Sequence, residues 1–390
     1  MAEVPTHARV APSITRSDAV DSAGSAGRAV SAGSPVSGGS AVSVGSTGAG
    51  TKERSRTERA SGALPTVRAR RRYRIVVTTL LALAIFFAGG LLAWDNPMPF
   101  GSFGFWRVAE LRATTIAAML IVAFSQALAT VSFQTVTNNR IVTPSLMGFE
   151  ALYLAVQTAA VYFLGVAGIS FFTGVPQFIL MIVLMVGLSL ALYGWLLTGR
   201  HGDIQIMLLI GIIIGGGLAS VAAFMQRMLT PSEFDVLTAR MFGSMSTADA
   251  SYLPVAIPLC LAAGGALWWR AKRLDVVALG RDTAMNLGVD HRREVMTVLF
   301  LVSILMAVST ALVGPMTFLG FLVATLAYQA ADTHDHRHVF PVSFLIGFVV
   351  LAGSYFVMKN VFYAEGVVSI IIELVGGSVF LFVILRKGRL

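Results

Sequence analysis

The run "THDHRH", from Thr333 to His338, concentrates side chains that can bind a metal ion. Imidazole nitrogens and carboxylate oxygens are common zinc ligands, and this part of the chain supplies both, from Asp332, His334, Asp335, His336 and His338. The three histidines are too closely spaced to share one face of a helix. The sequence therefore favours a solvated connection that starts a helix. A metal-binding sensor built on His334 to His338 stays an alternative.

Three polar side chains lie within or beside strongly apolar segments: Gln126, Glu150 and Glu373. Such groups are costly inside a bilayer, so they either serve function or pair with neighbouring helices. Glu373, just before "LVGGSVFLF", lies deeper in its segment than Glu150. Both interpretations stay open for Glu373, and structural pairing is favoured for Glu150. An ion-coupled secondary transporter that uses these two acids is a second hypothesis.

Common catalytic motifs are absent from the sequence. It contains no Gly-x-x-x-x-Gly-Lys loop for ATP, no His-Glu-x-x-His zinc signature and no Gly-x-Ser-x-Gly elbow. The single cysteine, Cys260, excludes an internal disulfide. We therefore expect neither an enzyme nor a bound cofactor. Any uphill work must draw on a partner or on an ion gradient.

The elements that carry these residues are membrane helices. The chain has 390 residues, of which 56% are hydrophobic and 13% charged, about half the charged fraction of a soluble domain. About 20 apolar residues cross a bilayer as a helix. The sequence predicts an all-α, polytopic membrane protein with ten spans, near residues 74–94, 112–133, 147–166, 176–197, 205–226, 252–269, 294–313, 316–331, 338–358 and 367–386.

Residues 1–68 are rich in Ser, Gly and Ala and lack aromatic residues, so we expect a disordered tail. The tail ends in "RARRRYR", which fits a positive anchor for the first span. The net charge of +9 reflects basic residues at helix ends and in the tail, and not a nucleic-acid site. Their distribution among the short loops predicts that both termini are cytoplasmic.

The cytoplasmic insert between spans six and seven, residues 274–293, is more elaborate than a linker. Its sequence "LDVVALGRDTAMNLGVDHRR" predicts two short amphipathic helices, broken at Gly280 and Gly288. An apolar face on this insert indicates a contact with another protein, through Val276, Val277, Leu279 and Leu287.

Four motifs give the chain a family resemblance. The loop "NNRIVTPSLMG" holds Asn139, Pro144 and Gly148, and "GPMTFLGFLVATLA" holds Gly314, Pro315 and Gly320. The last segment, "VSIIIELVGGSVFLFVILRK", holds Glu373. The insert matches the ATPase-facing loop at Leu274, Ala278, Leu279, Gly280, Ala284, Leu287 and Gly288. From about residue 75 to 390 the chain resembles permeases of FecCD-type ABC importers, which take up iron chelates and vitamin B12.

Where the chain departs from the common family pattern, it resembles the branch of the family that imports catecholate-type ferric siderophores. Arg140 stands where many members have Pro, and Ala324 and Thr325 replace Pro-His. The resemblance implies a fold like the vitamin B12 importer permease, over residues 69–390. It implies a ferric siderophore as the substrate, carried across a bacterial cytoplasmic membrane.

The resemblance also implies partners. It indicates a second permease subunit, in a heterodimer or a homodimer, and two ATP-binding subunits that hold ATP and Mg. An extracytoplasmic siderophore-binding protein would dock on outer cations, for which the chain offers Arg112 and Lys359. A Thr stands at the second position of the Arg pair that relatives carry, at Thr115.

Overall fold

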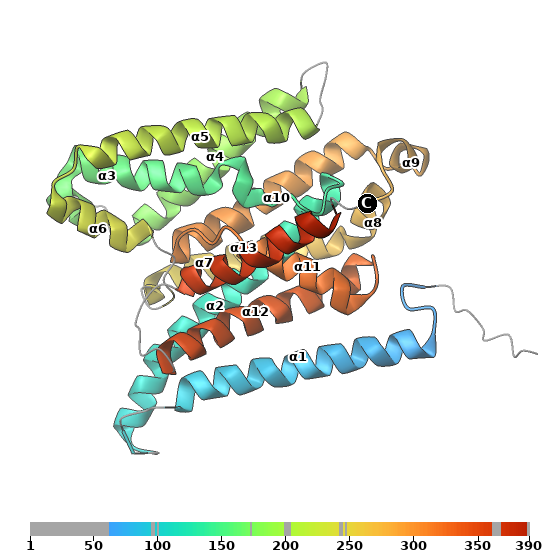
Figure 1. The fold of residues 1–390 in the computed structure, drawn as a ribbon, viewed down its shortest axis with the longest axis horizontal. Coiled ribbons are helices and arrows are strands. Elements are labelled where there is room, and N and C mark those ends of the chain that lie inside the picture. The colour runs from blue at the N-terminus through green and yellow to red at the C-terminus, as the bar shows by residue number, and fades with distance from the viewer. Residues whose placement is uncertain are drawn as a thin grey trace, which may run out of the picture. The chain divides into compact units, whose positions relative to one another are not determined.

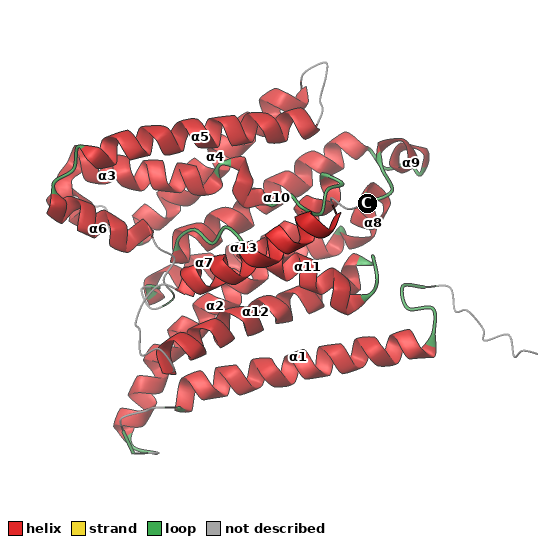
Figure 2. Ribbon diagram, in the orientation of Figure 1, coloured by secondary structure: helices red, strands yellow, loops and turns green. Residues whose placement is uncertain are grey.

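The computed structural model describes residues 62–94, 98–99, 101–171, 174–198, 204–241, 245, 248–360 and 368–387. Of the predicted tail, only 62–68 fall within these ranges. The described residues form helices and no strand, so the predicted all-α class is confirmed (Figure 2).

Ten apolar helices coincide with the ten predicted spans. Six of them are long and apolar enough to cross a membrane, by length and composition, and four contain shorter apolar stretches. They are α1 (Val67–Ala93), α2 (Phe103–Val136), α3 (Phe149–Phe171), α4 (Val175–Thr198), α5 (Ile204–Arg227), α7 (Leu253–Trp269), α10 (His291–Val313), α11 (Leu319–Ala331), α12 (His336–Asn360) and α13 (Val368–Lys387).

Helix α2 forms the centre of the bundle, where it packs against α10, α12, α7 and α11 (Figure 1). Most of its apolar span is buried inside the protein, whereas α1 packs mainly against α12 and leaves most of its span exposed. On the other side of α10, α4 continues the bundle, and α3 packs on α5. The exposed apolar helices have the composition of lipid-facing surfaces.

Helix α6 (Pro231–Met241) was not among the predicted elements, because it is short and polar. The sequence nevertheless carries a start signal for it in "TPSE". Glu233 Oε2 accepts from the backbone N–H of Thr230 at 2.9 Å, and Thr230 Oγ1 accepts from the backbone N–H of Glu233 at 3.4 Å. This reciprocal pair is a capping box, with Pro231 at the first helical position.

Four shorter elements complete the fold: the 3-10 turns η1 (Pro144–Met147) and η2 (Ala250–Tyr252), and the helices α8 (Ala271–Val277) and α9 (Arg281–Asn286). Helices α8 and α9 lie in the insert between α7 and α10, and α8 packs against α12, which follows the histidine run (Figure 1).

Candidate functional site

The insert between α7 and α10 folds into two short helices, as its sequence predicts. Gly280 follows α8 with φ +96°, and Gly288 follows α9 with φ +80°. A side chain is disfavoured at such angles, so glycine permits both sharp ends. The backbone N–H of Gly280 donates to the carbonyl of Val277 at 3.0 Å, which closes the last turn of α8.

Helix α8 is fixed to the membrane bundle. Leu274 and Val277 are buried, so Val277 is not on a partner-facing surface as the sequence suggested. An ion pair adds a polar anchor at the start of the insert: Arg270 Nη1 lies 2.6 Å from Glu294 Oε2 at the beginning of α10. The Glu294 side chain is only 5% exposed, and removing one partner from a buried pair is strongly destabilising.

Helix α9 and the residues beside it are open to solvent. Leu279, Met285 and Leu287 are 60%, 49% and 59% exposed, and Ala278 and Gly288 are also exposed. Ala284 is fully buried, and α9 packs on α8. The predicted apolar face is therefore divided between an anchored half, α8, and an exposed half, which we name the α9 surface: Leu279, Met285 and Leu287.

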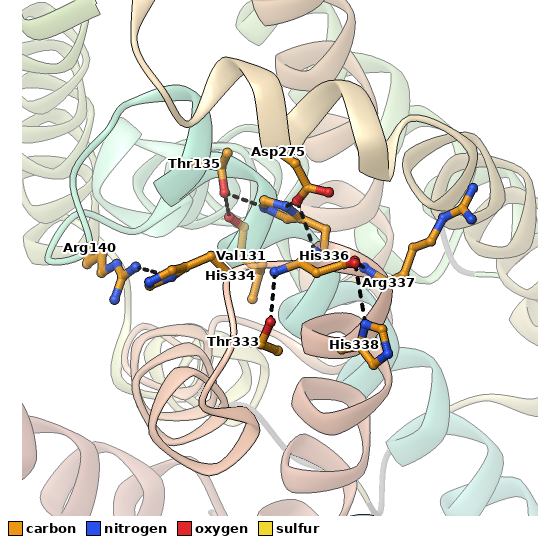
Figure 3. Close-up of polar contacts among 10 residues, drawn as sticks. Val131, Thr135, Arg140, Asp275, Thr333, His334, His336, Arg337 and His338 are labelled. Carbon is orange, nitrogen blue, oxygen red and sulfur yellow. Dashed lines mark hydrogen bonds and ion pairs between the residues drawn. The ribbon is translucent and has the colours of Figure 1, made fainter. Parts of the chain in front are cut away.

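The histidine run does not gather its rings around one point. The His336 imidazole is buried between Asp275 of α8 and Thr135 of α2, with Nδ1 2.5 Å from Asp275 Oδ1 and Nε2 2.7 Å from Thr135 Oγ1 (Figure 3). His334 instead contacts Arg140, and His338 lies 3.5 Å from Asp335. The part of the chain that the structure describes holds no group of three ligands suited to a metal.

His336 also corrects one expectation from the sequence. A solvated connection was expected here, and the start of a helix at this point is confirmed because α12 begins at His336. The side chain itself, however, is 3% exposed. Sequence spacing could not reveal this, because its partners Asp275 and Thr135 lie 61 and 201 residues away.

A cavity of about 840 Å³ opens beside this network. Its wall comes from the end of α2 and the loop after it, from α8 and the residues that follow it, from α11 and the loop between α11 and α12, from the start of α12, and from Ala63. Asn139 belongs to this loop, and its Oδ1 accepts from the backbone N–H of Ile141 at 2.9 Å. The Gln134 amide donates to the carbonyl of Arg140 at 2.8 Å, so the loop is tied to the last turn of α2.

The two Pro-Gly motifs meet inside the bundle. Pro144 starts η1, and Pro315 follows Gly314, which ends α10 with φ +90°. Thr317 Oγ1 donates to Glu150 Oε2 at 2.5 Å and joins the α10–α11 loop to the start of α3. This bond supports the structural role favoured for Glu150. Glu373 lies on α13, and the Glu373 side chain is exposed. Gly376, on the same helix, packs on Phe318 of the α10–α11 loop.

Glycines allow these motifs to pack closely. Gly148 has φ +88°, and a Cβ there would lie 3.1 Å from the Cα of Gly215 in α5. A Cβ at Gly320, in α11, would overlap Thr130 Oγ1 of α2. Small residues permit such close approaches between membrane helices.

We expect Gly148→Ala to destabilise the protein by about 1–2 kcal/mol, because an alanine is strained at positive φ, before any cost of the contact with Gly215. Gly216→Ala is the matched control, since a Cβ there meets nothing within 4 Å. Thermal unfolding of the purified chain in detergent compares the two. Equal unfolding temperatures would contradict the packing assigned to Gly148.

The two predicted outer cations lie at neighbouring helix ends. Arg112 Nη1 donates to the carbonyls of Leu91 at 3.3 Å and of Trp94 at 2.7 Å, which caps the end of α1. Lys359 is in the last turn of α12 and is half-buried. The ring of Phe356 packs on Trp94, which brings the ends of α1 and α12 together.

Comparisons with known proteins agree with this arrangement. The model of the FecCD transport family matches residues 73–386. The chain is 50% identical to the petrobactin import system permease protein FatC of Bacillus anthracis, over 85% of this chain and 94% of FatC. It is 35% identical to the petrobactin import system permease protein YclO of Bacillus subtilis, over 81% of this chain and 96% of YclO.

A solved structure of a metal-chelate type ABC transporter, in an inward-facing conformation, has the same fold. It superposes with a TM-score of 0.69 at 21% identity and covers 80% of this chain and 99% of that chain. The family match spans most of the sequence, and the resemblance drawn from the four motifs is confirmed. The chain is a multi-pass membrane protein that belongs to the FecCD transport family.

Proposed function

We propose that this chain is a permease subunit of an ABC importer that carries a ferric siderophore across a bacterial cytoplasmic membrane. The observation that carries the proposal is the 50% identity to FatC over nearly the whole of that petrobactin permease. The proposed substrate is ferric petrobactin or a chelate of closely similar chemistry. Because the sequence carries no Gly-x-x-x-x-Gly-Lys loop, we assign ATP and Mg to a separate ATPase subunit.

The α9 surface supports docking of that ATPase. Leu279, Met285 and Leu287 expose apolar side chains on a polar end of the bundle, and such clusters mark protein interfaces. Next to them lies a pocket of about 320 Å³, lined by Met285, Val289 and His291 among others. Because α8 is anchored by Leu274 and Arg270, a push on α9 would reach the bundle through a rigid helix.

Other surfaces support the remaining partners. Exposed apolar side chains on α5 and α13, such as Ile213, Phe224 and Leu374, are suited to a second permease subunit or to lipid. The resemblance favours a second subunit unlike this one. Both termini would face the cytoplasm, with Lys359 and the end of α1 on the outer side, where the binding protein would dock.

Purification of the complete importer with its binding protein tests the proposal. Mass spectrometry should find a ferric siderophore bound, and an ATPase and a second permease should be retained with this chain. A purified chain that retains no ATPase, or an importer that binds a substrate other than an iron chelate, would contradict the proposal.

The docking of the binding protein yields a separate prediction for Lys359. Lys359→Glu should slow association about tenfold at low salt, because charges at the rim of an interface act mainly on the association rate. Lys359→Gln, which removes the charge without reversing it, should have a smaller effect. Surface plasmon resonance at two salt concentrations measures both. Unchanged association at low salt would identify Lys359 as a lipid anchor.

Arg112 calls for a different experiment, because its guanidinium already caps α1. Charge reversal there would repel the same carbonyls, so a loss of binding could follow from damage to α1.

The N-terminal tail is expected to be dispensable for transport, since the family match begins only at residue 73. A deletion that tests this should keep the residues from Gly62 onward, because the carbonyls of Ala63 and Leu64 accept hydrogen bonds from Thr333 and Arg70. Removal of residues 2–61 should leave the rate of ferric petrobactin uptake within about twofold, given that the segment cannot bury a core. A loss of uptake with normal membrane insertion would show that the tail takes part in transport.

A further inference from the structure

The side chain of Asp275 joins the coupling insert to another helix of the bundle. Asp275 lies on α8, and its Oδ1 accepts from the backbone N–H of His336, the first residue of α12, at 3.1 Å. The same oxygen lies 2.5 Å from His336 Nδ1, which must be the donor because a carboxylate only accepts. Asp275 therefore caps the start of α12 from 61 residues away.

The other ring nitrogen of His336 reaches a third helix. His336 Nε2 lies 2.7 Å from Thr135 Oγ1, in the last turn of α2. Both side chains are buried, and the ring of Phe340 packs on the imidazole. One imidazole thus connects α8, α12 and α2 through two short bonds, as Figure 3 shows.

The contacts continue from the end of α2 into the loop toward η1. Beside Thr135, the Gln134 amide holds the carbonyl of Arg140 at 2.8 Å. The Arg140 guanidinium lies 4.4 Å from the centre of the Tyr328 ring and 3.0 Å from His334 Nδ1. This loop runs on to η1 and Gly148, where the chain packs on α5.

We propose that His336 is a positioning residue that carries a displacement of α8 to the end of α2 and to the loop that follows it. The proposal rests on the proposed function, in which an ATPase acts on α9. Buried polar networks have discrete bonded arrangements, and an unpaired member is costly in a low-dielectric interior. When α8 moves, the network must therefore either move α2 with it or break.

If His336 only held the docking surface in place, loss of the imidazole would release the ATPase, and the proposal predicts the opposite. Helix α8 is held in the bundle independently of His336, because Arg270 at its start pairs with Glu294 of α10 and because Leu274 and Val277 are buried. Loss of the imidazole should therefore leave the α9 surface in place and the ATPase bound. What it removes is the hydrogen-bonded link between Asp275 on α8 and Thr135 on α2, beside which the two helices also pack directly. ATP hydrolysis should therefore continue while transport falls.

The test uses the complete importer in proteoliposomes, with radioiron-labelled ferric petrobactin as the probe. The measured quantity is the number of ATP molecules hydrolysed per chelate imported. His336→Ala and Thr135→Val should each raise this number about tenfold, which corresponds to about 1.4 kcal/mol of lost coupling. The double variant should be no worse than either single variant, because both break one connection.

Conservative and exposed substitutions provide the controls. Thr135→Ser keeps the hydroxyl and should restore a ratio near that of the wild type, whereas Thr135→Val keeps the shape without it. Arg337→Ala changes an exposed neighbour of His336 and should have no effect. Should His336→Ala fail to assemble, Thr135→Val alone measures the same connection.

Unchanged ATP use per chelate in Thr135→Val, or additive effects in the double variant, would overturn the proposal. Loss of the ATPase from an otherwise folded His336→Ala complex would also overturn it, since His336 would then only hold the docking surface. A wild-type chain that retains no ATPase would contradict the proposed function itself, and the role of His336 with it.

Discussion

Leu279→Asp should detach the ATPase and abolish uptake while the chain still inserts into the membrane. Leu279 is 60% exposed beside α9, so the substitution costs the free permease little. At an interface the aspartate would lose its hydration without a partner, and central apolar contacts carry a large share of binding energy. We expect the affinity for the ATPase to fall at least about 30-fold, or about 2 kcal/mol.

Asn286→Asp is the matched control for Leu279→Asp. It adds the same charge to α9 at another exposed position, yet removes no apolar surface. It should retain the ATPase at near-normal levels. Quantitative copurification compares the two, and equal retention would show that the ATPase binds elsewhere.

The ion pair at the start of the insert should have the largest effect on stability. Arg270→Ala leaves Glu294, with a side chain only 5% exposed, without its 2.6 Å partner. Breaking a buried pair in this way costs about 3–5 kcal/mol; Arg273, at 3.5 Å from the same oxygen, would offset part of the loss.

Arg293→Ala provides the comparison, because the pair it makes with Asp290 lies in solvent, with side chains 88% and 54% exposed. An exposed pair of this kind contributes about 0–1 kcal/mol. Thermal unfolding in detergent should therefore separate the two variants by several degrees. Similar unfolding temperatures would mean that the Arg270–Glu294 pair does not anchor the insert.

The order and type of the helices could be predicted from the sequence because hydropathy dominates in membrane segments. All ten predicted spans are helices, and the glycine breaks of the insert lie at Gly280 and Gly288. Helix α6 was not predicted because its polar composition gives no hydropathy signal, although the capping pair of Thr230 and Glu233 marks its start.

Contacts between distant segments account for what could not be predicted. The insert was expected to show one apolar face, and the fold divides it: Val277 packs inward while Leu279 points outward. Periodicity in a seven-residue helix cannot tell which side meets the bundle. His336 was considered as a metal ligand or a solvated residue, and its burial depends on Thr135, on a helix 201 residues away.

The same reasoning applies to the acids of the membrane segments. The sequence shows that Glu150 is unusual in its surroundings, and the fold supplies Thr317 as its partner, 167 residues away. An ion-coupled transporter would use Glu150 and Glu373 to carry protons or cations. That alternative differs from an ATP-driven importer in its source of energy.

An experiment that identifies the source of energy therefore tests the proposed ATP-driven import directly. Proteoliposomes that contain the complete importer, with its binding protein on the opposite side from ATP, should accumulate radioiron-labelled ferric petrobactin. Uptake should require ATP and should continue when ionophores collapse every ion gradient. Uptake that stops with the gradients, proceeds without ATP and is lost in Glu150→Gln or Glu373→Gln would contradict the account.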